Sequence, residues 1–204
     1  MLIPHSQTYI NDVEKESVCR VLDTGHIGMG KEVESFEKKL AKLTNKKFAI
    51  CVDSGFSALR IILKILSISP GDKVGLPAYS CVALVNAVLS VGAKPVLIDN
   101  EQNRNVLNIG KEFKGIKALI VVHTFGEIVQ IEDFRKKYTI PVIEDCAHAL
   151  GCYPYGYEGD IAFSSFYATK LLGVGEGGAI FTNSEELRKE ANLYRSYVDQ
   201  APDK

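Results

Sequence analysis

From residue 48 onward, short apolar runs of strand length alternate with segments of helical periodicity, and this alternation constrains the fold more than any other feature. The apolar runs cover 47–52, 73–77, 94–99, 117–122, 141–146, 160–166 and 178–182. The helical segments cover 53–66, 80–91, 131–138 and 184–197. Strands and helices in this order are typical of βαβ units, so the sequence predicts an α/β fold with a mostly parallel sheet flanked by helices.

Ahead of this pattern, the sequence predicts two helices. Asn11 is a favourable N-cap for a first helix that ends at Gly25. In the second helix, Val33, Phe36 and Leu40 share one face. We expect residues 1–30 to form an N-terminal arm and helix, and residues 1–204 to form one domain, because no repeat or linker interrupts the chain.

Composition narrows the possible partners. The net charge of -1 gives no electrostatic reason to expect nucleic acid or an anionic membrane as a ligand. The N-terminus lacks the pattern of a signal peptide, and no apolar run has the length of a membrane span. The five cysteines form no CxxC pair, and Cys146, His148 and Cys152 have the spacing of no common metal site. We therefore expect a cytoplasmic protein without a bound metal.

Polar residues gather where the predicted strands end, at 53–55, 77–79, 123–126, 145–148 and 165–170. The carboxyl ends of parallel strands meet at one edge of a sheet, and ligands of α/β proteins bind at this edge. The sequence therefore predicts that these segments, which are far apart along the chain, converge on one site.

The segment after the strand 47–52 allows two interpretations. Ser54, Gly55 and Ser57 lie at the start of a helix, where backbone N–H groups and the helix dipole can bind a phosphate group. Ser54 can equally act as a simple helix cap. The residues alone leave both interpretations open.

Glu144 and Asp145 place two adjacent carboxylates at the carboxyl end of a buried strand. Burying their charges costs free energy unless a cationic partner lies nearby. A protonated heteroaromatic nitrogen would be such a partner, and an ion pair with an arginine is the alternative. Which of the two carboxylates faces a ligand depends on the register of the strand. His148 follows and can donate a hydrogen bond to a ligand or to a backbone carbonyl.

Lys170 lies in the stretch 164–178, between a β-prone run and a group of glycines around Glu176. Its small and apolar neighbours can desolvate the amine, as a nucleophilic, Schiff-base lysine requires. Ser165 is close enough in sequence to share a ligand with it. A phosphate seat, a carboxylate for a ring nitrogen and a reactive lysine are together the anchors of pyridoxal 5′-phosphate.

At this point the motifs can be matched to a family. VIEDCAHALG (142–151) and SFYATK…GEGGAIFTN (165–183) resemble the sugar aminotransferases of the DegT/DnrJ/EryC1/StrS type, and the resemblance extends in order over almost the whole chain. It implies the large domain of the aspartate-aminotransferase-like fold, with Lys170 as the catalytic residue bonded to pyridoxal phosphate. It also implies that Asp145 pairs with the ring nitrogen, that His148 lies near the phenolic oxygen, and that Gly55 and Ser165 bind the phosphate.

Two positions depart from the family pattern. Phe56 replaces the usual threonine after Gly55, so Ser57 or backbone N–H groups would have to supply that phosphate contact. Cys81 stands where an aromatic ring usually stacks on the cofactor, so either Tyr79 substitutes for that ring or the stacking is lost, which would weaken cofactor binding.

The resemblance implies a function and leaves alternatives. The expected reaction transfers an amino group from an amino acid, such as glutamate, to a nucleotide-linked keto sugar. Family members continue into a smaller C-terminal domain, so the chain could instead be a catalytically incomplete fragment or one partner of a split enzyme. Dehydratase or lyase chemistry with the same cofactor is a further alternative. The expected assembly is a homodimer, or a complex with a partner that carries the C-terminal half.

Overall fold

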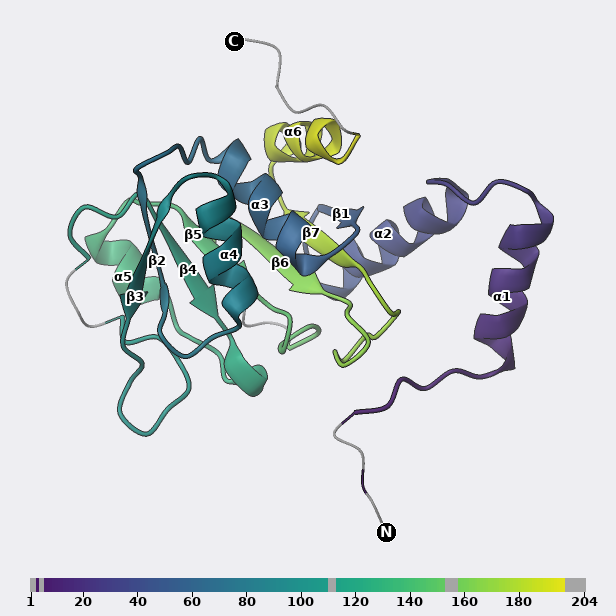
Figure 1. Ribbon diagram of the computed structural model, residues 1–204, viewed down its shortest axis with the longest axis horizontal. Helices are drawn as coiled ribbons and strands as arrows, with labels where there is room; N and C mark the ends of the chain where they lie inside the picture. Colours follow the sequence, from purple (N-terminus) through teal and green to yellow (C-terminus); the bar gives the residue numbers. More distant parts are fainter. Residues whose placement is uncertain (1–2, 4–5, 110–112, 153–157, 197–204) are drawn as a thin grey trace.

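The computed structural model describes Ile3 and residues 6–109, 113–152 and 158–196. At its centre is a seven-stranded sheet with the strand order β1-β7-β6-β5-β4-β2-β3 (Figure 1). The strands are β1 (Phe48–Val52), β2 (Lys73–Pro77), β3 (Lys94–Ile98), β4 (Ala118–Val122), β5 (Val142–Asp145), β6 (Ile161–Ser165) and β7 (Gly178–Thr182). Every strand pair is parallel except the two that β7 makes with β1 and β6. The predicted α/β fold with a mostly parallel sheet is therefore confirmed.

Helices cover both faces of this sheet. The helical segments of the described residues are α1 (Asp12–Asp23), α2 (Lys31–Leu43), α3 (Gly55–Ile65), α4 (Val82–Ser90), the 3-10 turn η1 (Thr124–Gly126), α5 (Glu132–Lys137) and α6 (Glu185–Arg195), and all but α1 and η1 pack on the sheet. On one face, α3, α4 and α6 share a core with alternate strand residues such as Ile120 and Ile180. On the other face, α2 packs through Leu40 and α5 through Phe134. Because both faces are covered, β4 is buried along its whole length.

Element boundaries differ slightly from the sequence prediction. The helix predicted over 80–91 begins after Cys81, which is its extended N-cap. The first helix ends at Asp23, and Gly25 follows with a φ of 68°, a left-handed conformation that glycine adopts without strain. The last helix ends at Arg195, and Tyr197, where we predicted its end, lies outside the described residues.

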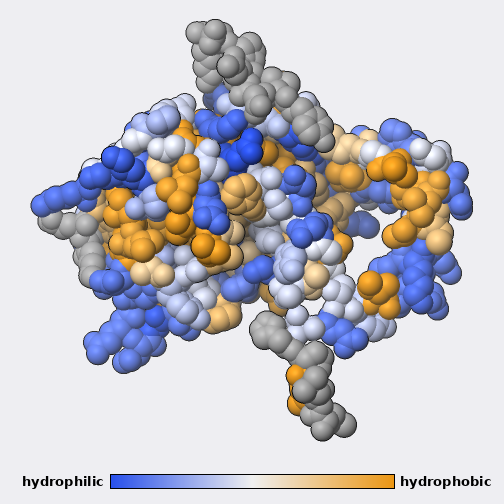
Figure 2. All heavy atoms as spheres, in the orientation of Figure 1, coloured by the Kyte–Doolittle hydropathy of each residue, from blue (hydrophilic) through white to orange (hydrophobic). Residues whose placement is uncertain are grey.

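Helix α1 stands away from the sheet (Figure 1) and, within the described residues, contributes none to the buried core. Its start is well defined, because Asn11 and Glu14 form a reciprocal capping box. Its exposed apolar residues include Val13, Val18 and Leu22. Figure 2 shows apolar surface on this N-terminal helical part of the molecule. No helix among the described residues is long and apolar enough to cross a membrane.

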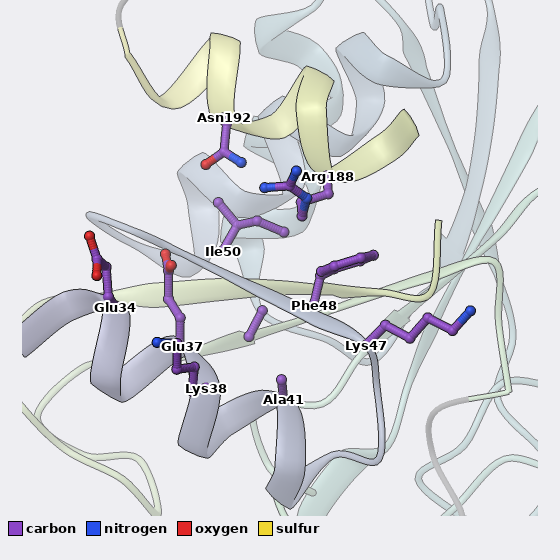
Figure 3. Close-up of a pocket in the computed structure, with 10 residues that line it drawn as sticks. Glu34, Glu37, Lys38, Ala41, Lys47, Phe48, Ile50, Arg188 and Asn192 are labelled. Atoms are coloured by element: carbon purple, nitrogen blue, oxygen red, sulfur yellow. The ribbon is translucent and has the colours of Figure 1, made fainter. Parts of the chain in front are cut away.

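Strand β1 forms an outer edge of the sheet, and a hollow of about 250 Å³ lies beside it between α2 and α6 (Figure 3). None of the predicted site residues lines this hollow. The backbone of the edge residue Cys51 is capped by side chains: its N–H donates to Glu37 Oε1 (2.8 Å), and its carbonyl accepts from Arg195 Nη1 (3.3 Å). Glu37 and Arg195 also form an ion pair. Such capping protects a sheet edge from pairing with another chain.

Candidate active site

A small cavity of about 80 Å³ lies at the edge of the sheet where the parallel strands end. Among the residues that line it are Gly55, Phe56, Cys81, Asp145, Ser165 and Lys170. These residues come from the starts of α3 and α4, the ends of β5 and β6, and the connection from β6 to β7. Three of the five predicted segments, 53–55, 145–148 and 165–170, therefore contribute residues to one cavity, whereas no residue of 77–79 or 123–126 lines it.

The turn between β1 and α3 forms one wall of this cavity. Ser54 caps α3, since its Oγ accepts the N–H of Ser57 (3.1 Å), so both serines are engaged in capping. The N–H groups that begin a helix have no partner inside it, which leaves Gly55 and Phe56 available to an anion. A Cβ at Gly55 would lie 2.8 Å from the Cβ of Ser165, so only glycine allows this turn to approach the end of β6 so closely.

Asp145 carries the buried carboxylate of the site. The N–H of Ala147 donates to its Oδ1 (2.9 Å). Burial raises the pKa of Asp145 above the ordinary carboxyl value; the Ala147 hydrogen bond, Lys170 and His123 act in the opposite direction but more weakly. The charged form of Asp145 is therefore costly in the free protein, and a cation in the cavity would compensate that cost.

Glu144 points away from this cavity, which settles the register that the sequence left open. Its side chain accepts hydrogen bonds from the backbone N–H groups of Glu158 and Gly159, on the connection to β6. Its Oε2 lies 3.4 Å from Nε2 of the buried His123. Asp145, and not Glu144, lines the candidate site.

His123, Glu144 and the sulfur of Cys146 bring potential metal-ligand atoms within 4.8 Å of one another, all of them buried. Hydrogen bonds account for this cluster. The N–H of Val129 donates to His123 Nδ1 (3.2 Å), which leaves Nε2 of the imidazole to face Glu144. We interpret the cluster as a structural support that holds the ends of β4 and β5 together.

Lys170 is in contact with His148: its Nζ lies 2.9 Å from His148 Nε2. The imidazole is stacked on the ring of Phe125, with the ring centroids 5.3 Å apart and an angle of 6° between the planes. Burial lowers the pKa of His148, and the neighbouring Lys170 adds to the effect. Sequence reasoning did not single out Phe125, because nothing in the sequence reveals its left-handed backbone (φ 54°).

Two of the predicted cofactor contacts lie differently with respect to the cavity. Cys81 lines it at the N-cap of α4. Tyr79 is exposed and does not line this cavity, and its backbone N–H donates to Asn100 Oδ1 (3.2 Å). In this geometry Cys81, and not Tyr79, faces the cavity.

The residues fit pyridoxal 5′-phosphate on physical grounds. Asp145 is a buried carboxylate whose charged form needs a cation, and a protonated pyridine nitrogen is one. The start of α3 offers N–H groups to a phosphate, and Lys170 supplies an amine in the same cavity. A lysine, a buried carboxylate and a helix N-terminus at one sheet edge are the groups that would hold a phosphorylated aldehyde cofactor.

Comparison with known proteins identifies the family. The sequence model of the DegT/DnrJ/EryC1/StrS aminotransferase family matches residues 8–202, so the chain belongs to this family. It is 38% identical over 195 residues to the dTDP-3-amino-3,6-dideoxy-alpha-D-galactopyranose transaminase of Aneurinibacillus thermoaerophilus, covering 90% of this chain and 54% of the relative. It is 34% identical over 194 residues to the GDP-perosamine synthase of Caulobacter vibrioides, covering 89% and 52%.

Solved structures agree in fold. The structure of S. venezuelae DesV in complex with a ketimine intermediate superposes with a TM-score of 0.84 at 31% identity, covering 92% of this chain and 54% of that one. The sugar aminotransferase Spr1654 from Streptococcus pneumoniae in its PLP form gives a TM-score of 0.85 at 27% identity, covering 94% and 57%. The chain thus spans about half the length of the relatives it matches.

Proposed function

We propose that this chain is the cofactor-binding part of a pyridoxal-phosphate-dependent aminotransferase that moves an amino group from an amino acid, such as glutamate, to a nucleotide-linked keto sugar. The observation that carries the proposal is the convergence of Lys170, Asp145 and the Gly55 turn on one cavity. Two relatives support the substrate class, since they are named for amino sugars linked to dTDP or GDP.

Each residue has a distinct task in this proposal. When bound, pyridoxal phosphate supplies an aldehyde and an electron-withdrawing ring that stabilises negative charge at the adjacent carbon. Asp145 would keep a proton on the ring nitrogen, because a buried carboxylate and a protonated nitrogen stabilise each other. The start of α3 and Ser165 would hold the phosphate. Lys170 would supply the amine that bonds to the aldehyde and would carry a proton at the substrate carbon as a general acid and base.

The experiment is a spectroscopic titration of the purified chain with pyridoxal phosphate. We expect the absorption band of the amine-bound cofactor to appear with the intact chain and to be lost in Lys170→Ala. Lys39→Ala, which removes an exposed lysine of α2, is the matched control and should retain the band. No band with the intact chain, or the same band with Lys170→Ala, would contradict the proposal.

A second candidate is supported by length: the chain spans about half of its relatives, so it could bind the cofactor and act only with a partner polypeptide. The test is amino transfer from glutamate to a nucleotide-linked keto sugar, measured with the chain alone and with the remaining half of a relative such as the A. thermoaerophilus transaminase supplied as a separate polypeptide. Full activity of the chain alone excludes this second candidate.

A further inference from the structure

The loop between β6 and β7, residues 166–177, carries Lys170 and is closed by hydrogen bonds between its two sides. One of these bonds runs from the backbone N–H of Ala168 to the carbonyl of Gly175 (3.0 Å). Lys170 lies two residues beyond Ala168, where its own N–H closes a turn onto the carbonyl of Tyr167 (2.8 Å). The place of the Lys170 amine at the cavity therefore depends on how firmly this part of the loop is held.

The carbonyl of Ala168 is held from outside the loop, by the N-terminal arm that precedes α1. The hydroxyl of Thr8 donates to this carbonyl (2.9 Å), although 160 positions separate the two residues in the chain. Among residues 6–10 of the arm, Thr8 is the only one that is not exposed. In Figure 1 the arm runs from α1 towards the side of the molecule where the loop lies. Both backbone polar groups of Ala168 are thus engaged, one within the loop and one by the arm.

Gly173, on the returning side of the loop, leaves the space that this contact needs. A Cβ at Gly173 would lie 2.7 Å from the carbonyl oxygen of Ala168 and 3.1 Å from Thr8 Oγ1. A side chain at this position would therefore press on the donor and the acceptor of the same hydrogen bond. The arm, the outgoing side of the loop and the returning side meet at this one point.

Apolar packing does not account for the place of the arm. Within the described residues, α1 contributes none to the buried core, and the apolar residues of α1 and the arm, such as Tyr9 and Ile10, are exposed. The hydrogen bond from Thr8 is a directional contact instead. Losing one such bond changes a local equilibrium about two- to tenfold, which is enough to alter how often a surface loop opens.

We propose that Thr8 is a positioning residue for Lys170: its hydroxyl holds the carbonyl of Ala168 and, through the loop, sets where the Lys170 amine lies at the cavity. The inference rests on the proposed function in that this amine bonds to an aldehyde ligand. In that reaction the amine nitrogen becomes doubly bonded to the aldehyde carbon, and two hydrogens of the amine leave with the aldehyde oxygen as water. Holding the loop in one place lowers the entropic cost of bringing the two groups together.

The first test needs no cofactor. Hydrogen exchange of the backbone amides is followed by mass spectrometry in the wild type and in Thr8→Val, which keeps the shape of the side chain and removes its hydroxyl. We expect amides of residues 166–177 to exchange about two- to tenfold faster in Thr8→Val. Ser6→Ala changes an exposed residue of the same arm and should exchange as the wild type does. Equal exchange of this loop in Thr8→Val and the wild type would overturn the inference.

The second test separates positioning of Lys170 from general support of the fold. Calorimetric titration gives the affinity for pyridoxal phosphate and for pyridoxine phosphate, which has the same ring and phosphate but an alcohol in place of the aldehyde. We expect Thr8→Val to weaken pyridoxal phosphate binding about two- to tenfold and to leave pyridoxine phosphate binding unchanged. Thr8→Ser keeps the hydroxyl and should bind both ligands as the wild type does. An equal loss for both ligands would overturn the positioning role.

The two tests also separate this inference from the proposed function. If the loop exchanges faster in Thr8→Val but neither ligand binds the wild type, the proposed function fails and the hold of the arm on the loop stands. If pyridoxal phosphate binds the wild type and Thr8→Val equally well, the positioning role fails and the proposed function stands.

Discussion

Substituting Gly178 by alanine tests how tightly the candidate site is built. Gly178 begins β7 directly behind the turn of Ser54 and Gly55. A Cβ there would lie 2.6 Å from the carbonyl carbon of Ser54 and 2.7 Å from the nitrogen of Gly55. These neighbours are backbone atoms of a helix cap. They cannot move to relieve the overlap, whereas the end of a flexible side chain could.

The magnitude follows from that overlap. Overpacking a well-packed site costs about 1–3 kcal/mol, and rigid backbone obstacles place Gly178→Ala at the upper end, about 3 kcal/mol. For a protein of this size, each kcal/mol lowers the unfolding midpoint by roughly 2–4 °C, so we expect a decrease of about 6–12 °C. Pyridoxal phosphate should also bind less tightly, because the displaced turn is its proposed phosphate seat.

The measurements are thermal unfolding by circular dichroism and a cofactor titration. Gly28→Ala is the matched control, since nothing lies within 4 Å of a Cβ at that glycine. Its midpoint should stay close to that of the wild type. If Gly178→Ala unfolds at the same temperature as Gly28→Ala and binds the cofactor equally well, the close contact between β7 and the turn does not exist as described.

Two further predictions concern ionisable groups. Burial raises the pKa of Asp145, so the native state keeps the carboxyl proton to a higher pH than the unfolded chain does. Ionisation of Asp145 therefore destabilises the cofactor-free protein as the pH rises above about 4. The free energy of unfolding falls by about 1.4 kcal/mol for each unit by which the pKa is raised. Asp145→Asn should therefore raise the urea midpoint more at pH 7 than at pH 4; an equal gain at both pH values would contradict this. Burial, reinforced by Glu37, raises the pKa of Cys51 to about 12, whereas Cys19 and Cys81 are exposed. Ellman's reagent at pH 8 should modify Cys19 and Cys81 first and Cys51 only after unfolding. Rapid colour from a Cys19→Ser, Cys81→Ser, Cys152→Ser triple variant, which keeps Cys51 and the buried Cys146, would refute the assignment.

The location of the site could be predicted because it depends on topology rather than on side-chain detail. Once the chain is recognised as βαβ units, the residues after each strand must lie at one sheet edge. This argument placed Gly55, Asp145 and Ser165 together although they are distant in sequence, and the cavity contains all three. The argument needs only the direction of each strand, and the apolar runs were long enough to reveal the strands.

Details that depend on contacts between distant loops could not be predicted. The cavity is lined by Asp145 and not by Glu144, whose side chain accepts hydrogen bonds from the backbone N–H groups of Glu158 and Gly159 outside the strand. The stacking of Phe125 on His148 needs a left-handed backbone at a residue with a side chain, a conformation that sequence propensity argues against. The periodicity of residues 12–23 predicted a helix correctly, but could not tell that its apolar residues lie exposed.

The reversed strand β7 explains how a lysine that follows β6 is held at this edge. Because β7 is antiparallel to β6 and pairs Gly178 with Ser165, it begins at the same sheet edge where β6 ends. The connection between them can then fold back as a local loop instead of crossing the sheet, and backbone hydrogen bonds from Phe166 to Gly177 (2.8 Å) and from Ala168 to Gly175 (3.0 Å) close it. From the N-terminal arm, the hydroxyl of Thr8 donates to the carbonyl of Ala168 (2.9 Å). Backbone hydrogen bonds therefore hold the loop that carries Lys170 to the start of β7, and Thr8 of the N-terminal arm holds it from the other side. A rigid loop of this kind is what a residue needs if it is to present an amine to a ligand.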